Sequence, residues 1–558
     1  EMQTGEGKTF AGLLPAYVLA LSGRGVHVCL PNAYLAQRDQ AIASPVFSRL
    51  GLSTAVRREN DSFQVTRAAY EADLTYGPGQ LFGFDYLRDQ WTRRQFADSP
   101  LGSATMARVL GRSMDSQLRM RGLYAAVVDE ADQVLVDDAT SPLLICAAND
   151  RPAPDAMLHQ IARLTALSLQ RNADFEIDSV AGDVQLTDHG FRHVYENEEF
   201  ATHVQLNRPW HAYVISALKA EFLLLRDRHY VVIDDRICLV EQSTGRVFRD
   251  RTWSDGLHQA VQTKERLVIT AETQSQGRIT RQAYFRMYEN LCGMTGTAQA
   301  CRRELHSIYG LDVSEIKTRL PSRRRVMETK VFPSRSAKLV GLVDETTQVI
   351  REGRAVLVGT NHIEQTETIA EAFRKAGIIP AVLNGVQSGE EADIIAQAGS
   401  ARAVTVATHL AGRGTDIKLA SSVAKAGGLH VIGWEHHRLS RVDRQLIGRG
   451  ARQGDPGTAR FLISPDDHFI AGQAPHLAAA VIRCLDCPKA IPALCHSLAA
   501  VQRTLESHDR SVRYRLMRQN QRPGNALTRG IAPAENPRGE ANQNRSKLNR
   551  PLRFGVIR

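Results

Sequence analysis

Long apolar runs are missing from this chain of 558 residues. The most apolar stretch near its start, residues 11–30, is interrupted by Pro15, Arg24 and His27. A transmembrane helix needs about 20 consecutive apolar residues. A signal peptide needs a cationic start and a cleavage site, which this stretch lacks. We therefore expect a cytoplasmic protein.

Cysteine and aromatic residues are scarce. Only 6% of the residues are aromatic, whereas a protein that grips single-stranded RNA uses aromatic side chains on which the bases stack. The eight cysteines are scattered, which is typical of small buried apolar residues and not of a disulfide framework. One group has a spacing that suits zinc, namely Cys484, Cys487, Cys495 and His496. The residues between them are mostly apolar, so we do not expect zinc there.

Acidic residues are fewer than basic ones. Lys and Arg number 70 against 60 Asp and Glu, which gives a formal charge of +10. Such an excess suits an anionic partner, either nucleic acid or acidic lipid, but it is also ordinary for a soluble protein of this size. Part of the excess lies in residues 521–558, whose Pro, Asn and Gly content predicts a disordered basic tail.

An initiator Met is absent as well, because the chain begins at Glu1, within a phosphate-loop motif. The strand that normally feeds such a loop does not precede it. We therefore expect a fragment or the product of a truncated gene.

The strongest local signal is this phosphate loop, Thr4-Gly5-Glu6-Gly7-Lys8-Thr9. Glycines let backbone N–H groups approach phosphates closely, and the helix that follows adds positive potential. In this pattern Gly5, Glu6 and Gly7 form the cradle. Lys8 reaches the terminal phosphates, and the Thr9 hydroxyl binds Mg²⁺. The motif predicts ATP and Mg²⁺ as cofactors.

A second, acidic motif ends an apolar run. Residues 127–132 read Val-Val-Asp-Glu-Ala-Asp, as expected of a buried parallel strand that ends in carboxylates. At the carboxyl end of that strand, Asp129 can hold Mg²⁺ and Glu130 can polarise the attacking water. Together with the phosphate loop, the motif predicts ATP hydrolysis with Lys8 and Glu130 as catalytic residues.

Arginine motifs farther along distinguish the chain from a single phosphate-loop domain. One contains Arg413 and Asp416 after a predicted strand, and the other contains Arg449 and Arg452. Two arginines three residues apart on a helix share one face, and from an opposing lobe that face can meet the terminal phosphate as an arginine finger. We predict a second lobe whose Arg449 and Arg452 are catalytic and whose Arg413 and Asp416 bind nucleotide. Closure of the cleft would then couple hydrolysis to movement.

The surrounding segments resemble the SecA preprotein translocase ATPase family. Similar segments lie at residues 16–23, 34–39, 74–77, 82–89, 293–298, 411–417, 427–429 and 455–457. Asp129 to Asp132 spell the DEAD-box helicase signature, but the stretch from Thr244 to Ala260 resembles SecA and has no helicase counterpart. The resemblance runs from Glu1 to about Gln519.

This resemblance implies an α/β fold with two RecA-like parallel-sheet lobes, an inserted α+β substrate-clamp domain and a short C-terminal helical segment. It implies ATP-driven movement of unfolded preproteins through a SecYEG-type channel, with peripheral association to the inner (plasma) membrane. Anionic lipid and a homodimer fit it as further partners, whereas nucleic acid does not.

Domain boundaries follow from the insertion. Roughly 160 residues separate the acidic motif from Thr295, where a RecA-like lobe needs only a short connection. Residues 230–233 and 237–240 predict antiparallel strands, and residues 174–190 predict another strand pair. We expect lobe 1 at residues 1–145 and 281–318, the inserted preprotein cross-linking-like domain at 146–280, lobe 2 at 319–475, a helical scaffold at 476–520 and the tail at 521–558.

Two other interpretations stay open. The helical wing and two-helix finger that the family carries after its scaffold are missing from the sequence. This favours an accessory or regulatory ATPase without full translocase activity. A DEAD-like RNA helicase is the other alternative, and it leaves the insertion unexplained.

Overall fold

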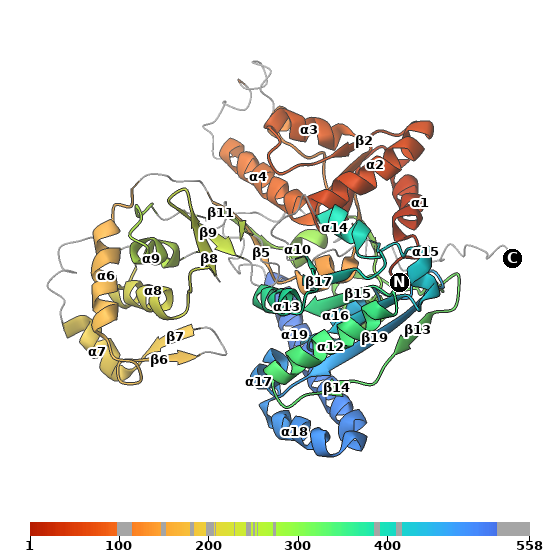
Figure 1. Cartoon of the computed structure of the whole chain (residues 1–558). Helices are drawn as coiled ribbons and strands as arrows, with labels where there is room; N and C mark the ends of the chain where they lie inside the picture. Colours follow the sequence, from red (N-terminus) through yellow and green to blue (C-terminus); the bar gives the residue numbers. More distant parts are fainter. Residues whose placement is uncertain are drawn as a thin grey trace.

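The computed structural model describes residues 1–97, 106, 114–146, 152–178, 183–196, 206, 208–227, 229–240, 247–248, 252–253, 255–271, 275–383, 391–408 and 416–521. Two α/β bodies with parallel sheets lie next to each other, and an α+β part projects from the first (Figure 1). In these ranges no helix combines the length and apolar character that crossing a membrane requires. The predicted fold class of two parallel-sheet lobes, an α+β insertion and a helical end is confirmed.

The first sheet is parallel throughout. Its central strands β1 and β4 are buried at every position, because helices cover both faces of the sheet. The strand predicted for the acidic motif is β4, so Asp129 and Glu130 lie at its carboxyl end. In sheet order the strands are β12 (Asn290–Met294), β4 (Ala125–Asp129), β1 (Val26–Leu30), β3 (Leu74–Pro78) and β2 (Thr54–Val56).

Polar side chains determine where two helices of the first lobe begin. Asn32 accepts a hydrogen bond from the N–H of Leu35, and Ser62 accepts one from the N–H of Val65. Each bond satisfies a donor that the first turn of a helix leaves unpaired. The helices of this lobe are α1 (Lys8–Ala20), α2 (Ala33–Arg49), α3 (Phe63–Glu71), α4 (Gly79–Ala97), α10 (Arg281–Phe285) and α11 (Arg302–Tyr309).

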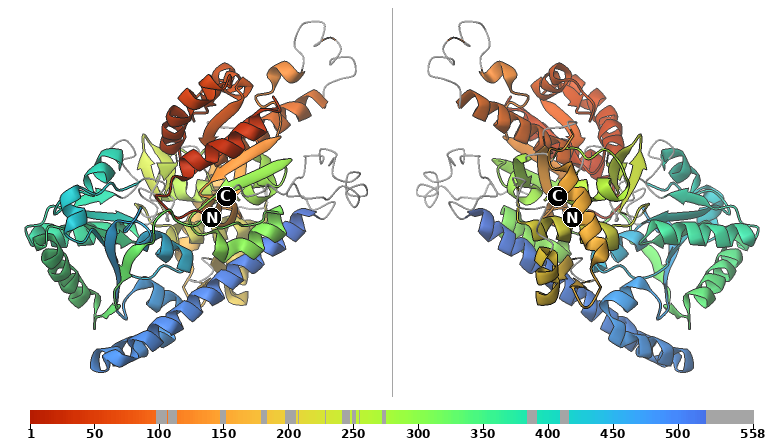
Figure 2. Two further views of the ribbon diagram at one scale, coloured as in Figure 1. Left: turned by 90° about the vertical axis from the view of Figure 1, so that its right-hand side faces the viewer. Right: turned by 90° about the vertical axis from the view of Figure 1, so that its left-hand side faces the viewer.

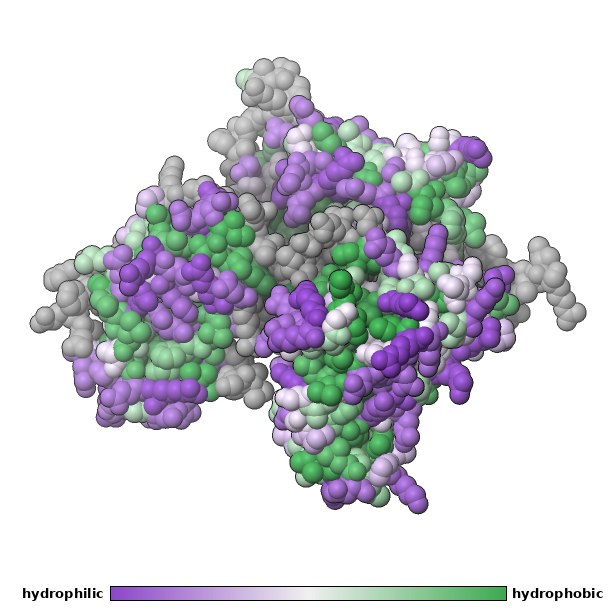
Figure 3. Space-filling view, in the orientation of Figure 1, coloured by the Kyte–Doolittle hydropathy of each residue, from purple (hydrophilic) through white to green (hydrophobic). Residues whose placement is uncertain are grey.

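Helix α1 packs on the first sheet through small residues and exposes large ones. Its buried residues are Gly12, Ala16 and Ala20. An apolar stripe lies on the exposed side, because residues spaced by three or four share a helix face. It consists of Phe10, Leu14, Val18 and Leu21, which are between 62% and 71% exposed. Hydrophobic residues show on the surface in this upper right region of Figure 3.

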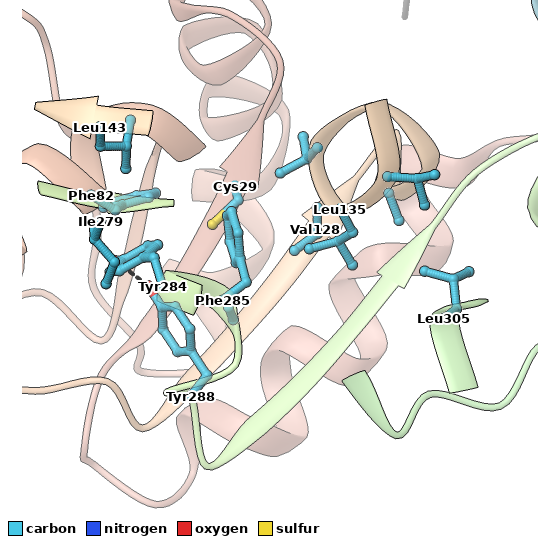
Figure 4. Close-up of a cluster of buried hydrophobic side chains, with 14 of the residues drawn as sticks. Cys29, Phe82, Val128, Leu135, Leu143, Ile279, Tyr284, Phe285, Tyr288 and Leu305 are labelled. Atoms are coloured by element: carbon cyan, nitrogen blue, oxygen red, sulfur yellow. Dashed lines mark hydrogen bonds between the residues drawn. The ribbon is translucent and has the colours of Figure 1, made fainter. Parts of the chain in front are cut away.

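A buried cluster joins the two parts of the first lobe that the insertion separates. Cys29 and Val128 come from β1 and β4, whereas Tyr284, Phe285 and Tyr288 follow the insertion (Figure 4). The hydroxyls of the two tyrosines are 2.8 Å apart and hydrogen-bonded. Burying one such side chain contributes about 1.5–3 kcal/mol, so the cluster anchors the returning chain to the first sheet.

The insertion leaves and re-enters the first lobe through one antiparallel strand pair, β5 (Pro142–Cys146) and β11 (Ser275–Thr280). Both predicted antiparallel pairs are confirmed: β8 (Tyr230–Ile233) with β9 (Arg236–Val240), and β6 (Phe175–Asp178) with β7 (Asp183–Leu186). The remaining elements are α6 (Ala156–Ser168), α7 (Asp188–Glu196), α8 (Trp210–Phe222), β10 (Val247–Phe248) and α9 (Leu257–Lys264). Two separate buried clusters give the insertion a core of its own.

The second sheet is also parallel. In order its strands are β13 (Arg323–Val326), β19 (Pro456–Ile463), β18 (Leu429–Gly433), β15 (Val356–Thr360), β17 (Val404–Thr408) and β16 (Ala381–Leu383), with β14 (Lys330–Val331) also paired to β19. The strand predicted ahead of Arg413 is β17. The helices are α12 (Arg335–Arg351), α13 (Ile363–Lys375), α14 (Glu391–Gln397), α15 (Ser421–Lys425), α16 (Ser440–Ile447) and α17 (His468–Gln473).

After α17 the chain forms the helices α18 (Ala478–Asp486) and the 31-residue α19 (Ile491–Gln521). Figure 2 shows α19 as a long rod. It touches both lobes, because Arg513 pairs with Glu304 of α11, with 3.0 Å between Nη2 and Oε2, while Gln502 donates to the backbone oxygen of His437 at 2.7 Å. The helix predicted for the C-terminal segment is therefore present and bridges the lobes.

Candidate nucleotide site

The phosphate loop enters α1 through two glycines in the left-handed conformation. Gly5 has φ 89° and Gly7 has φ 86°, a region that costs other residues about 1–2 kcal/mol. A Cβ on Gly5 would lie 2.9 Å from Cδ of Arg452, so an arginine of the second lobe packs directly on the loop. Lys8 and Thr9 are the first two residues of α1, where the helix N-terminus favours a phosphate group.

Lys8 and Glu130 form an ion pair, with 2.7 Å between Nζ and Oε1. Burial alone would lower the pKa of Lys8, but the charges of Glu130 and Asp129 outweigh it and raise that pKa. Glu130 follows β4 directly and has φ 49°, which is rare for a non-glycine residue and marks a constrained position. The two predicted catalytic residues of the first lobe are thus in contact.

Asp129 is suited to a Mg²⁺ ion. Its side chain is buried, and Oδ1 has no hydrogen-bond partner among the residues that the structure describes. Burial raises its pKa to about 6, with the charge of Glu130 acting in the same direction and that of Lys8 opposing it. A bound cation would satisfy this carboxylate, and hard divalent cations prefer oxygen ligands such as Asp129 and Thr9. The residues present therefore fit Mg²⁺ bound with a nucleotide.

Asp39 is a site residue that the sequence analysis did not assign. It lies on the buried side of α2, in line with Ala36 and Ala43, and its carboxylate accepts a hydrogen bond from the Thr9 side chain. Burial raises the pKa of Asp39, while Arg38 and Thr9 oppose that shift. The signal was a lone carboxylate on an otherwise apolar helix face, since buried charges need a partner.

Asp132, the last residue of the acidic motif, connects the two lobes. It is completely buried. Within the first lobe it accepts hydrogen bonds from the hydroxyls of Thr295 at 2.6 Å and Thr297 at 2.9 Å. From the second lobe, Gln445 of α16 donates its amide to Asp132 at 2.5 Å, and Arg441 lies 3.9 Å away. One carboxylate is therefore hydrogen-bonded to side chains of both lobes.

The prediction that Arg449 and Arg452 share a helix face is wrong. Helix α16 ends at Ile447, and Ala451 between the two arginines has φ 56°. Glycines at 448 and 450 favour this ending, because glycine costs a helix about 1 kcal/mol each. Both arginines are nonetheless buried, at 9% and 8% exposure, in the turn that follows α16.

This turn contacts the phosphate loop. Arg452 pairs with Asp416, with 2.6 Å between Nη1 and Oδ1, so a predicted catalytic arginine and a predicted nucleotide ligand are in contact. Gln453 donates to the backbone oxygen of Gly5 at 2.8 Å, and the N–H of Arg319 donates to Glu6 at 3.1 Å. The predicted nucleotide ligand Arg413 lies outside the described residues.

The four residues with zinc-like spacing lie in and beside the C-terminal helices. Cys484 is buried in a hydrophobic cluster with Val481 and Leu494, which agrees with its expected apolar role. Cys495 contacts the hydroxyl of Thr329 at 3.6 Å. Cys487 and His496 are exposed.

Comparison with known proteins identifies relatives over most of the chain. A model of the SecA DEAD-like domain matches residues 1–306, and a model of the SecA P-loop domain matches residues 321–423 and 419–488. A protein translocase subunit SecA from Clostridium botulinum is 39% identical over 473 residues, which are 84% of this chain and 54% of the relative. The SecA subunit of Lawsonia intracellularis is 40% identical over 475 residues, again 84% and 54%. The chain thus spans about half the length of these curated relatives.

Among solved structures, Dbp5 of Saccharomyces cerevisiae bound to RNA and ADP BeF3 is 12% identical and has a TM-score of 0.38. That match covers 87% of this chain and 82% of Dbp5. Mss116p bound to single-stranded RNA and AMP-PNP is 11% identical with a TM-score of 0.39, covering 84% of this chain and 67% of Mss116p. Likeness at this level says nothing about function.

Proposed function

Since this chain belongs to the SecA family, we propose that it is a P-loop ATPase that couples ATP hydrolysis to the movement of unfolded preproteins through a SecYEG-type channel. One observation supports the ATPase most directly, namely that side chains of both lobes converge on the phosphate loop. Lys8 and Glu130 come from the first lobe, while Arg452 packs on Gly5 from the second. Movement of the lobes changes the spacing of these groups.

In the proposed site, Lys8 binds the terminal phosphates, and Thr9 and Asp129 hold Mg²⁺. Bound Mg²⁺ supplies positive charge that offsets the negative charge on the transferring phosphoryl group. Glu130 orients the attacking water and accepts its proton, which requires Lys8 to exchange Glu130 for the phosphates. Arg449 and Arg452 bring positive charge from the second lobe, and Arg413 and Asp416 complete the nucleotide contacts.

We assign the substrate clamp to residues 146–280. This part has its own buried clusters and connects to the first lobe through the strand pair of β5 and β11, so it can turn without disrupting the first sheet. Parts that carry their own core and few connections move relative to each other by default. An extended polypeptide held between this part and the lobes would move when the cleft closes.

The proposed partners are an unfolded preprotein, the channel and anionic lipid, with a homodimer as a further arrangement. The proposed location is the cytoplasm with peripheral association to the inner membrane. The formal charge of +10 supports contact with acidic headgroups, because each cation near such a surface contributes about 1 kcal/mol.

The first experiment measures phosphate release from ATP. Lys8→Ala and Glu130→Gln should abolish it, because each removes one half of the buried pair at the phosphate loop. Lys375→Ala and Glu289→Gln are matched controls, since these side chains are 76% and 48% exposed. If the wild-type protein releases no more phosphate than the two site variants, the ATPase proposal is wrong.

A second experiment separates the substrates. Phosphate release is compared after addition of an unfolded preprotein with channel-bearing vesicles, and after addition of RNA. Stimulation by the preprotein and vesicles together is the expected result. Stimulation by RNA alone would favour a helicase, and unstimulated hydrolysis without preprotein movement would favour an accessory ATPase.

A further inference from the structure

A second cluster of polar side chains lies in lobe 2, away from the phosphate loop. His362, Glu435 and His468 each offer one ligand atom, and these atoms lie within 4.8 Å of one another. The three residues are far apart in sequence but follow the adjacent strands β15, β18 and β19. Because the strands are parallel, their carboxyl ends meet at one edge of the sheet, which is where α/β sheets bind ligands.

Gln365 of α13 holds all three residues in place. Its amide nitrogen donates to Glu435 Oε1 at 2.5 Å and lies 2.8 Å from Nδ1 of His468. Gln365 also forms a reciprocal capping box with His362 at the start of α13. The second oxygen of Glu435 accepts the backbone N–H of His468 at 2.8 Å. A buried carboxylate and two imidazoles are therefore oriented by one shared neighbour, as is usual around metal ligands.

We propose that His362, Glu435 and His468 bind a borderline divalent transition-metal ion, with Zn²⁺ as the type. Two imidazoles and one carboxylate suit Zn²⁺, whereas Mg²⁺ and Ca²⁺ prefer oxygen ligands. Zinc bonds of about 2.0–2.2 Å place tetrahedral ligand atoms roughly 3.4 Å apart, so the side chains close by about an ångström on binding. The His468 side chain is 45% exposed and has room to do so.

Arg335 occupies one of the proposed metal ligands in the metal-free protein. Its Nη2 lies 3.0 Å from Nδ1 of His468, and its backbone N–H donates to Asp466. Metal binding requires the guanidinium to leave the ring. The neighbouring Lys338 is paired with Asp467, so once Arg335 has moved, Glu435 supplies the negative charge that faces the ion.

The ion would stiffen a segment that reaches the interface between the lobes. Glu435 begins the short connection to α16, and this connection is already held to α19 through the bond from Gln502 to the backbone oxygen of His437. At the other end of α16, Gln445 bonds to Asp132 of the first lobe. Metal binding at the sheet edge thus restrains the start of α16, whose other end contacts the first lobe.

The test is calorimetric titration of the full chain, stripped with a chelator, with Zn²⁺ and without nucleotide. One equivalent should bind, and His362→Ala and His468→Ala should each weaken binding at least tenfold. His306→Ala is the matched control, because this histidine is 65% exposed and pairs only with Asp312 among the ion pairs of the described residues. Both site histidines are exposed, so the two variants should keep the fold. Unchanged affinity in both of them would overturn the proposal.

Cysteine binding is excluded by a companion variant. Replacing Cys484, Cys487 and Cys495 by serine should leave the Zn²⁺ affinity unchanged, and Co²⁺ should bind without a thiolate charge-transfer band. Loss of binding in this variant would overturn the proposed ligand set. Arg335→Ala should tighten binding severalfold, because a positive charge that competes for His468 is removed. Weaker binding in that variant would contradict the assigned role of Arg335.

Discussion

Replacing Gln445 by alanine tests whether hydrolysis depends on contact between the lobes. Gln445 donates hydrogen bonds to Asp132 at 2.5 Å and to Thr297 at 3.1 Å. Within the described residues, these side-chain hydrogen bonds do not involve the phosphate loop, Lys8 or Glu130. A hydrogen bond to a charged group contributes about 1.5–3 kcal/mol. Asp132 keeps the hydroxyls of Thr295 and Thr297, so the first lobe itself should stay folded.

The expected effect is a fall in the ratio of closed to open cleft. Each 1.4 kcal/mol corresponds to about a tenfold change, so the turnover number should drop between roughly tenfold and a hundredfold. The affinity for nucleotide should change less than the turnover number, because Lys8 and the phosphate loop keep their positions in the first lobe. Steady-state phosphate release and equilibrium nucleotide binding measure the two quantities. Gln473→Ala, an exposed change on α17, is the control.

A double-mutant cycle sharpens this test. If Gln445 acts through Asp132, the Gln445→Ala change should cost less in an Asp132→Asn background, with a coupling energy of at least about 0.5 kcal/mol. Wild-type turnover in Gln445→Ala, or strictly additive effects in the cycle, would refute the idea that this carboxylate couples the lobes.

Three further outcomes are expected. His27 is stacked on Phe82 and buried, and burial lowers its pKa from 6.5 to about 3. At a pH between these values the folded protein binds fewer protons than the unfolded chain, so the free energy of unfolding should fall as the pH drops from about 6.5 towards 3. Urea titrations at several pH values should find a smaller fall in His27→Phe. Arg513→Ala leaves Glu304 buried without its partner and should lower the free energy of unfolding by about 3–5 kcal/mol, whereas replacing both by methionine should restore most of it. Gly5→Ala should abolish phosphate release, because its Cβ meets Arg452. The control Gly23→Ala has the same left-handed strain but open space around it, so it should lower the free energy of unfolding by only about 1–2 kcal/mol and leave phosphate release intact.

One strand in each lobe, β4 and β17, could be predicted from sequence. The acidic motif ends a run of apolar residues, which is typical of a strand covered on both faces, and β4 is that strand. The antiparallel pairs of the insertion were predicted from alternation between short turns. In each case the signal lies within one short segment.

Features that depend on long-range geometry were missed or wrong. The spacing of Arg449 and Arg452 suits a helix, but the glycines beside them and the left-handed Ala451 end α16 first. Asp39 meets Thr9 only because α1 and α2 pack on the same sheet. His362 and His468 are brought together by the order of the strands β19, β18 and β15, which no local pattern encodes.

Helix α19 limits the kinds of motion that the lobes can make. At about 1.5 Å per residue, the eleven residue steps from Gln502 to Arg513 form a rigid strut roughly 16 Å long, which lobe 2 holds at Gln502, Glu506 and Asp509 and lobe 1 holds at Arg513. A strut of constant length forbids the lobes from simply pulling apart unless one anchor breaks. It permits the lobes to rotate about α19. A small rotation at the helix then produces a larger displacement in the parts of the lobes that lie farthest from it.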